Sequence, residues 1–284
     1  MKCAWQELMS LLPQWLRREV ETYEETAQDI RLRLNGKPEI VCSDGSHWLS
    51  QTVEPSDISL IINAATRYSP WAASSISQGY IGAPGGHRIG LCGEAVIKEG
   101  IMTGIRQINT LCIRVARDFP GIAQELADLP GSVLIIGAPG WGKTTLLRDL
   151  IRQRSDRSSH ISVVDERGEL FPMGFHRGDR TEVLTGCPKA QGIQRLLRTM
   201  GPEVIAVDEI TAAEDCEALQ QAAWCGVSLL ATAHAAGLQD YLHRQVYAPL
   251  VKQNLFDHIV ILHPDKHWHL ERSKGWTSNG SVRY

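Results

Sequence analysis

Residues 137–144 read GAPGWGKT and directly follow an apolar run, VLII, at 133–136. The pattern is G-x-x-x-x-G-K-[ST], in which glycines let a loop turn its backbone amides inward, toward phosphate oxygens. Lys143 would pair with the β- and γ-phosphates, and the Thr144 hydroxyl would bind Mg²⁺. The residues expected to contact the nucleotide are Gly137, Ala138, Pro139, Gly140, Trp141, Gly142, Lys143, Thr144 and Thr145.

A pair of acids ends a second apolar run, VIAVDEI, at 204–210. Asp208 is placed to hold Mg²⁺ through water. Glu209 follows it, where a carboxylate can polarise a water molecule for attack on the γ-phosphate. An Asp-Glu pair at the end of a strand is a weak signal alone, but downstream of a phosphate-binding loop it predicts a magnesium and water-activating site.

The stretch HISVVDERGEL, at 160–170, supplies one strand between these two motifs in the chain. An intervening strand combined with an acid pair is typical of ATP-hydrolysing, RecA-like proteins rather than of nucleotide kinases. Asp165 and Glu166, with Glu169 nearby, are therefore candidate catalytic side chains beside the phosphates. The alternative is a solvated, charged turn.

A further buried strand is expected in VSLLATAHA, at 227–235, which ends in Thr232 and His234. Polar side chains in this place could sense the γ-phosphate or relay its loss to a neighbouring domain. We take His234 as a candidate site residue, with a purely structural histidine as the alternative.

Short apolar strands alternate with helical segments from Ser132 onward, which indicates a parallel sheet covered by helices. Sheets of this kind place their sites at the carboxyl ends of the strands, where the motifs above lie. The sequence thus predicts an α/β fold: a RecA-like P-loop ATPase domain over 118–284, preceded by a smaller α+β domain over 1–117. A connecting helix is expected at 119–131.

The first part of the chain carries its own signals. Apolar residues recur at helical spacing in the first thirty residues, and Pro13 fits the first turn of a second helix. Asn35-Gly36 predicts a hairpin turn, and Ser56 is a candidate helix cap. The glycine-rich region 79–117 contains strand-like pieces.

Composition limits the function classes. The net charge of −3 over 284 residues argues against stable nucleic-acid binding. Seven scattered cysteines without a CxxC pair argue against a disulfide or zinc framework. Neither a membrane-spanning run nor a signal peptide is evident, so we expect a soluble, cytosolic chain. His263, His267 and His269 would share a strand face, but without a fourth ligand a metal site is disfavoured.

Several longer blocks carry a family resemblance. The chain resembles the stage III sporulation protein AA family of endospore-forming bacteria, which is similar in turn to the hexameric secretion and pilus ATPases. The matching blocks cover most of the chain: LLPQWLRREV, DIRLRLNGKP, GGHRIGLCGEAV, GIRQINTLCIRVAR, GAPGWGKTTLLRDLIR, VVDERGEL, TEVLTGCPKAQGIQRLLRTMGPEVIAVDEI and TAHA.

The resemblance implies an ATPase that uses ATP and Mg²⁺, forms a homo-oligomeric ring, most readily a hexamer, and acts at the mother-cell side of the sporulation channel membrane. Its partners would be integral membrane proteins of that apparatus. VVDERGEL corresponds to the acidic box of the secretion ATPases and TAHA to their histidine box. The resemblance also implies arginine fingers from the first domain, with Arg88, Arg106 and Arg114 in the matching region and Arg114 and Arg88 favoured.

Three residues depart from the family pattern: Trp141 replaces a small residue, and Thr211 and Ala235 replace glycines. Trp141 and Thr211 keep a first alternative to a motor open, a nucleotide-dependent scaffold with little hydrolysis. A second alternative is a RecA-like nucleic-acid motor, against which the mild acidity speaks.

Overall fold

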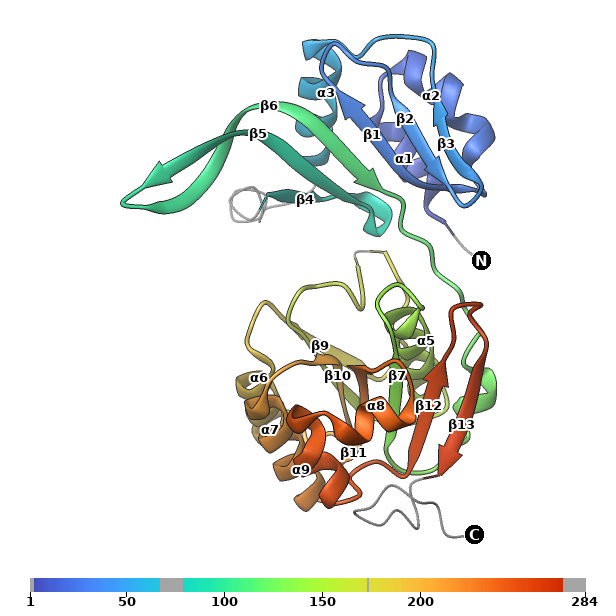
Figure 1. The fold of residues 1–284 in the computed structure, drawn as a ribbon, viewed down its shortest axis with the longest axis vertical. Helices are drawn as coiled ribbons and strands as arrows, with labels where there is room; N and C mark the ends of the chain where they lie inside the picture. The colour runs from blue at the N-terminus through green and yellow to red at the C-terminus, as the bar shows by residue number, and fades with distance from the viewer. Residues whose placement is uncertain (1–2, 67–78, 173, 273–284) are drawn as a thin grey trace. The chain divides into compact units, whose positions relative to one another are not determined.

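A computed structural model describes residues 3–66, 79–172 and 174–272. The chain divides into two compact units, each described here by itself (Figure 1). Unit 1 comprises Met1–Asp118 with Pro172–Phe175, and unit 2 comprises Phe119–Phe171 with His176–Tyr284. The boundary predicted at residue 117 lies one residue before the end of the first stretch of unit 1.

Unit 1 is an antiparallel sheet with helices packed on it. Among the described residues its strands lie in the order β3-β2-β1-β6-β5-β4. The strands are β1 (Ala27–Arg33), β2 (Glu39–Cys42), β3 (Gly45–Trp48), β4 (Tyr80–Gly82), β5 (Arg88–Lys98) and β6 (Ile101–Arg114). The helices are α1 (Trp5–Leu11), α2 (Gln14–Val20) and α3 (Pro55–Thr66), and short 3-10 turns span Glu21–Tyr23 and Pro84–Gly86.

The predicted amphipathic faces build the core of this unit. Trp5, Leu8, Leu12 and Leu16 are buried with the strand residue Ile30 in one cluster. Asn35 adopts a positive φ of 61° in the turn between β1 and β2, as the Asn-Gly signal predicts. Ser56 does not cap α3, because it lies inside the first turn. The backbone N–H of Glu54 donates to the Asp57 carboxylate there instead (2.9 Å).

Unit 2 is built on a mainly parallel sheet with the strand order β13-β12-β7-β11-β10-β8-β9 among the described residues (Figure 1). The strands are β7 (Val133–Gly137), β8 (Ile161–Asp165), β9 (Thr181–Thr185), β10 (Val204–Ile210), β11 (Ser228–His234), β12 (His258–Leu262) and β13 (Trp268–Arg272). Of these described strands, β13 alone runs antiparallel to its neighbour, β12. The predicted alternation of strands and helices is therefore correct.

Alternating residues of the buried strands face opposite layers of helices. In β7, Val133 and Ile135 pack with α5, whereas Leu134 and Ile136 pack with the helices of the other face. The helices are α5 (Lys143–Asp156), α6 (Lys189–Thr199), α7 (Ala213–Trp224), α8 (Leu238–His243) and α9 (Ala248–Lys252), with 3-10 turns at Gln124–Leu126 (η3) and Gln245–Tyr247 (η4). A sheet with both faces covered explains why its strands read as continuous apolar runs.

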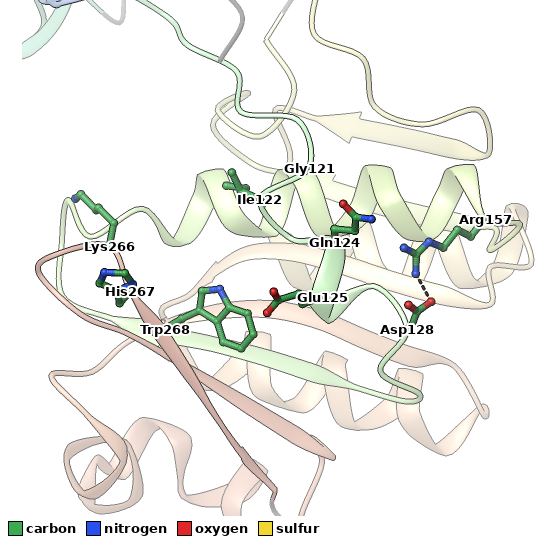
Figure 2. A pocket seen from close by; sticks show the side chains of 9 residues that line it. All are labelled: Gly121, Ile122, Gln124, Glu125, Asp128, Arg157, Lys266, His267 and Trp268. Atoms are coloured by element: carbon green, nitrogen blue, oxygen red, sulfur yellow. Dashed lines mark hydrogen bonds and ion pairs between the residues drawn. The ribbon is translucent and has the colours of Figure 1, made fainter.

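Two expectations for unit 2 were wrong in detail. The segment 119–131 is not an α-helix but a loop with the 3-10 turn η3 (Figure 2). Side chains of α5 hold its backbone, since the Ala123 N–H donates to Asp149 (2.8 Å) and the Leu129 carbonyl accepts from Arg154 (2.6 Å). In addition, two strands, β8 and β9, intervene in the chain between the phosphate-binding loop and β10. In the sheet itself, the strand between β7 and β10 is β11.

Candidate nucleotide site

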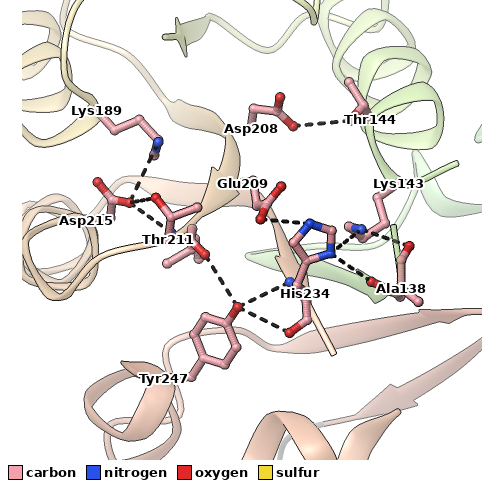
Figure 3. Close-up of polar contacts among 12 residues, drawn as sticks. Ala138, Lys143, Thr144, Lys189, Asp208, Glu209, Thr211, Asp215, His234 and Tyr247 are labelled. Atoms are coloured by element: carbon pink, nitrogen blue, oxygen red, sulfur yellow. Dashed lines mark hydrogen bonds and ion pairs between the residues drawn. The ribbon is translucent and has the colours of Figure 1, made fainter. Parts of the chain in front are cut away.

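Three adjacent parallel strands end at the same edge of the sheet. β11 lies between β7 and β10, so the residues at their carboxyl ends, Gly137, His234 and Glu209, are neighbours. Figure 3 shows side chains from these strands and from the start of α5 converging there. The edge therefore gathers the residues that the motifs predict from three separate stretches of sequence.

The loop GAPGWGKT joins β7 to α5 and holds its shape through glycine. Gly140 and Gly142 have φ values of 76° and 105°, which L side chains rarely adopt. A Cβ on Gly137 would lie 3.1 Å from the Cβ of Leu262, tighter than an ordinary contact. The loop places the start of α5, with its unpaired backbone amides, toward the site, as an anion-binding loop requires.

The Lys143 ammonium is buried and donates to two acceptors, the Ala138 carbonyl (3.1 Å) and the Nδ1 atom of His234 (2.9 Å). Burial lowers the pKa of Lys143, while the Glu209 and Asp208 carboxylates act in the opposite direction. A buried cation with only neutral direct partners is a group that an anionic ligand would stabilise.

His234 links this lysine to the acid pair. Its Nδ1 accepts from Lys143, so its Nε2 carries the proton that faces the Glu209 carboxylate, 2.8 Å away (Figure 3). The histidine is thus a bridge between the lysine expected to bind phosphate and the acid expected to activate water. Of the two interpretations of His234, the geometry supports the one in which it takes part in the site.

Asp208 and Thr144 form the second contact across the site. The Thr144 hydroxyl lies 3.4 Å from the Asp208 carboxylate. Burial, followed by repulsion from Asp165, Glu169 and Glu209, raises the pKa of Asp208 to about 6, and the bond from Thr144 opposes this rise. A divalent cation would neutralise such crowded carboxylates, so a hydroxyl and an acid in this arrangement fit Mg²⁺.

The pairing of β10 with β11 is irregular at Asp208. Val207 lies opposite Ala231 and Glu209 opposite Thr232, so Asp208 is skipped in the register. In a regular strand, consecutive side chains point to opposite faces. Here both carboxylates line one pocket, together with the Thr144 side chain. A local irregularity of this kind re-aims side chains next to sites.

The two acids of β8 occupy different environments. Asp165 is fully buried, and its carboxylate accepts the backbone N–H groups of Glu169 (3.0 Å) and Leu170 (2.9 Å). Burial raises its pKa and these bonds lower it. Glu166 is exposed and pairs with Lys189 (2.5 Å). Asp165 thus closes the turn after β8, while Glu166 lines the pocket that also holds Asp208.

Two further residues belong to the site although their motifs did not single them out. Lys189, at the start of α6, is buried and bridges Glu166 and, at 3.8 Å, Asp215. The Tyr247 hydroxyl, in η4, lies 3.2 Å from the His234 N–H and 3.4 Å from the Ile210 carbonyl. The CPKA block holds Lys189, but no spacing rule points to Tyr247.

Two of the three departures from the family pattern, Trp141 and Thr211, have structural explanations. Trp141 packs against the core cluster of the α5 face, and its Cε3 atom would lie 3.4 Å from a Cβ on Gly137. The Thr211 N–H (3.0 Å) and hydroxyl (3.3 Å) both donate to Asp215 at the start of α7. Neither residue therefore removes a group that the phosphate-binding loop or the acid pair needs.

The three arginines of interest belong to unit 1. Arg88 and Arg114 lie directly opposite each other on β5 and β6. Arg88 stacks 3.9 Å over the Tyr80 ring, and Arg114 pairs with Asp29 at 3.3 Å while its side chain stays 72% exposed. Like charges placed directly opposite are unfavourable in a sheet. Arg106 pairs with Glu94 (2.6 Å).

The histidines after β12 give no support for a metal. His263 and His269 hydrogen-bond each other at 2.7 Å and stack. Over the part of the chain that the structure describes, neither belongs to a cluster of three metal-ligating side chains.

Within the same described residues, no helix has the length and apolar character needed to cross a membrane.

The strand order, the phosphate-binding loop after β7 and the acid pair at the end of β10 together define a RecA-like P-loop fold of the secretion-ATPase type. The model of the family described as sporulation stage III, protein AA, matches residues 4–272, and the chain belongs to this family. It is 34% identical over 291 residues to stage III sporulation protein AA of Bacillus subtilis, covering 95% of this chain and 92% of that relative.

Solved structures agree on the fold. The Legionella pneumophila ATPase DotB is similar with a TM-score of 0.61 and 19% identity, over 92% of this chain and 80% of that one. The pilus retraction motor PilT with bound ADP gives a TM-score of 0.59 and 19% identity, over 87% and 77% of the respective chains. The predicted family and fold class are thus confirmed.

Proposed function

We propose that this protein is a Mg²⁺-dependent ATPase motor of the secretion-ATPase type. The observation that carries the proposal is the continuous path from Lys143 through His234 to Glu209 at one edge of the sheet. It joins a group suited to hold phosphate to a group suited to activate water.

In this proposal, Lys143 exchanges its bonds to Ala138 and His234 for bonds to the β- and γ-phosphates. His234 then loses the hydrogen bond at its Nδ1 atom, and its hydrogen bond with Glu209 changes. The Glu209 carboxylate accepts a proton from the attacking water. Thr144 directly and Asp208 through water would hold Mg²⁺, which supplies neutralisation of the phosphate charge. Phosphate binding and water activation are thereby coupled through one imidazole ring.

Other residues have supporting roles in the proposal. Asp165 acts as a positioning residue, because backbone amides occupy its carboxylate. Glu166 forms an ion pair with Lys189, and both residues line the pocket that also holds Asp208. Arg114 and Arg88, and after them Arg106, are the candidate arginine fingers. A finger contributes about 10³–10⁵ in rate.

Family membership supports a proposal for the cellular setting. We propose that the protein forms a homo-oligomeric ring, most readily a hexamer, at the inner face of the mother-cell membrane. It would be cytoplasmic and peripheral, and would energise a sporulation channel through integral membrane partners. Support comes from the B. subtilis relative and from the fold shared with DotB and PilT.

The Glu209→Gln variant tests the proposal. It keeps the side-chain volume and a hydrogen bond to His234 but cannot accept a proton from water. We expect ATP binding within about threefold of the parent and a loss of at least about 10²-fold in phosphate release. Glu217→Gln, an exposed acid on α7, is the matched control and should behave like the parent. Unchanged turnover in Glu209→Gln would contradict the role of Glu209.

A nucleotide-dependent scaffold is the second candidate. It is favoured by Trp141 and Thr211, which stand where the family pattern has a small residue and a glycine. Phosphate release measured with the membrane partners present separates the two functions. A motor should be stimulated by them, whereas a scaffold should bind ATP and show no stimulation.

A further inference from the structure

The hairpin of β2 and β3 gathers three side chains of kinds that bind transition metals. Cys42, Asp44 and His47 each offer one ligand atom, and these three atoms all lie within 4.8 Å of one another. The hairpin belongs to unit 1, where β3 is the edge strand of the sheet (Figure 1). The nucleotide site described above is built from unit 2, so this cluster needs its own explanation.

The register of the hairpin brings the three residues together. Cys42 lies opposite Gly45, and Ile40 lies opposite His47, which leaves a tight turn that contains Asp44. Alternate residues of a strand share a face, and residues directly opposite each other on paired strands share it as well. Cys42 and His47 therefore belong to the same face of the hairpin, and Asp44 follows directly beyond Cys42. The cluster is a product of backbone geometry.

The distances suit a tetrahedral ion. The Nε2 atom of His47 lies 3.4 Å from an Asp44 carboxylate oxygen, beyond the range of about 2.7–3.2 Å that is usual for an N–H···O hydrogen bond. Around an ion with bonds of about 2.0–2.2 Å, two tetrahedral ligand atoms stand about 3.3–3.6 Å apart. The Cys42 sulfur lies within 4.8 Å of both atoms, so a side-chain shift of about 1 Å completes the triangle.

Two of the three side chains have a neighbour that orients them. Cys42 is buried, 6% exposed, and its thiol donates to the Thr26 hydroxyl at 3.5 Å. The Tyr23 ring packs beside the His47 imidazole, with centroids 5.3 Å apart. Groups that hold the ligands from behind are typical of metal sites. When an ion binds, the Cys42 thiol gives its proton to water, and the Thr26 hydroxyl can then donate to the thiolate.

The donor set distinguishes between metals. A thiolate with an imidazole and a carboxylate suits Zn²⁺, whereas Mg²⁺ and Ca²⁺ prefer oxygen ligands alone. The other group of three among the described residues, Asp156, His176 and Asp179, has no sulfur, and all its members are exposed. Three protein ligands leave a fourth position on Zn²⁺ for water or for a donor from another molecule.

We propose that the β2–β3 hairpin binds Zn²⁺ through Cys42, Asp44 and His47. The ion would tie β3, whose side chains are mostly exposed, to the rest of the sheet. The site does not depend on nucleotide binding, so it stands or falls separately from the proposed function. A search for paired cysteines misses it, because the pattern C-x-D-x-x-H has one cysteine.

Co²⁺ titration of the reduced, nucleotide-free full chain tests this, with Co²⁺ as the spectroscopic substitute for Zn²⁺ and excess Mg²⁺ to fill sites made of oxygen ligands. The parent should develop a near-ultraviolet thiolate-to-cobalt charge-transfer band and the visible bands of tetrahedral Co²⁺. Equimolar Zn²⁺ should remove both, because Zn²⁺ binds such ligands more tightly. Cys42→Ser should lose the charge-transfer band, and His47→Gln should weaken Co²⁺ binding by about 10-fold or more.

Two matched controls change the same residue types elsewhere. Cys225→Ser removes an exposed thiol, and His176→Gln removes the histidine of the other cluster. Both should keep the charge-transfer band and the Co²⁺ affinity of the parent.

Absence of the band in the parent, or its persistence in Cys42→Ser, would overturn the assignment. If Cys42→Ser does not fold, His47→Gln and Asp44→Asn decide, because both side chains are accessible to solvent. Weaker Co²⁺ binding with an unchanged circular dichroism spectrum supports the site. Parental Co²⁺ affinity in both variants means that His47 and Asp44 form an ordinary ion pair, and refutes it.

Discussion

Asp208 is held in an environment that disfavours its charge. Burial and the neighbouring carboxylates of Asp165, Glu169 and Glu209 raise its pKa to about 6. A site built only for stability would avoid this crowding. Side chains with strongly shifted pKa values cluster at functional sites for this reason, and a bound Mg²⁺ would remove the repulsion.

The Asp208→Asn variant should therefore be more stable than the parent in the absence of Mg²⁺. Because the pKa of Asp208 is raised in the folded protein, the ionised carboxylate lowers the free energy of unfolding. This loss of stability is fully present above the folded pKa of about 6 and is absent below the pKa of Asp208 in the unfolded chain. We expect a gain of about 1–3 kcal/mol in the free energy of unfolding at pH 8, vanishing near pH 4. Urea unfolding across this pH range measures it, with the exposed acid change Glu182→Gln as control. A gain that grows as the pH falls would contradict the explanation.

At the scale of elements, the site depends on how the ends of β10 and β11 are held together. Tyr247 in η4 lies within hydrogen-bonding distance of the His234 N–H, the His234 carbonyl and the Ile210 carbonyl (Figure 3). These contacts lie just beyond the irregular pairing at Asp208. One hydroxyl from outside the sheet thus fixes the strand ends that carry His234 and Glu209.

The Tyr247→Phe variant removes that hydroxyl, so it should loosen the ends of β10 and β11. It keeps the buried ring and therefore creates no cavity in the core. We expect a stability loss of about 1 kcal/mol and a fall in kcat of about 3- to 10-fold. Tripolyphosphate affinity should stay the same, because the phosphate-binding loop is untouched. Tyr241→Phe is the control, since Tyr241 packs beside Tyr247, with ring centroids 5.2 Å apart, and belongs to no bond at the site. Equal kcat in the parent and Tyr247→Phe would remove Tyr247 from this role.

At the scale of the whole molecule, the candidate fingers and the phosphate-binding loop belong to different units of the chain. Arg114 remains 72% exposed although it pairs with Asp29, so its guanidinium can reach another molecule. The opposed pair Arg88 and Arg114 keeps two positive charges at adjacent strand positions. The repulsion between these two guanidinium groups is explained if they contact phosphate in an assembled ring.

Mixing two inactive variants tests whether neighbouring subunits complete the site. Arg114→Ala and Glu209→Gln should each bind ATP and release little phosphate alone. In mixed rings, an Arg114→Ala subunit supplies Glu209 and its Glu209→Gln neighbour supplies Arg114, so about one interface in four should be active. We expect the mixture to recover phosphate release. The mass of the rings is measured in parallel to show that they form. No recovery in rings shown to be mixed would place the finger elsewhere.

Much of the fold and part of the site could be predicted from the sequence. The phosphate-binding loop, the acid pair and the alternation of strands and helices are local patterns, because each arises from neighbours in the chain. The same holds for the buried faces of α1 and α2. The connecting segment 119–131 was predicted wrongly as a helix that its final Pro-Gly pair would end, whereas the structure has the 3-10 turn η3 there.

Sequence alone determined that this chain carries a phosphate-binding loop followed by acids at strand ends, since each motif is contiguous. Only the tertiary structure decided how these motifs meet. The order of parallel strands is set by long-range packing, and it placed β11, and so His234, between Lys143 and Glu209. Contacts such as those of the Tyr247 hydroxyl, whose partners come from the two strands β10 and β11, leave no periodic trace in a sequence and become visible only when the sheet is assembled.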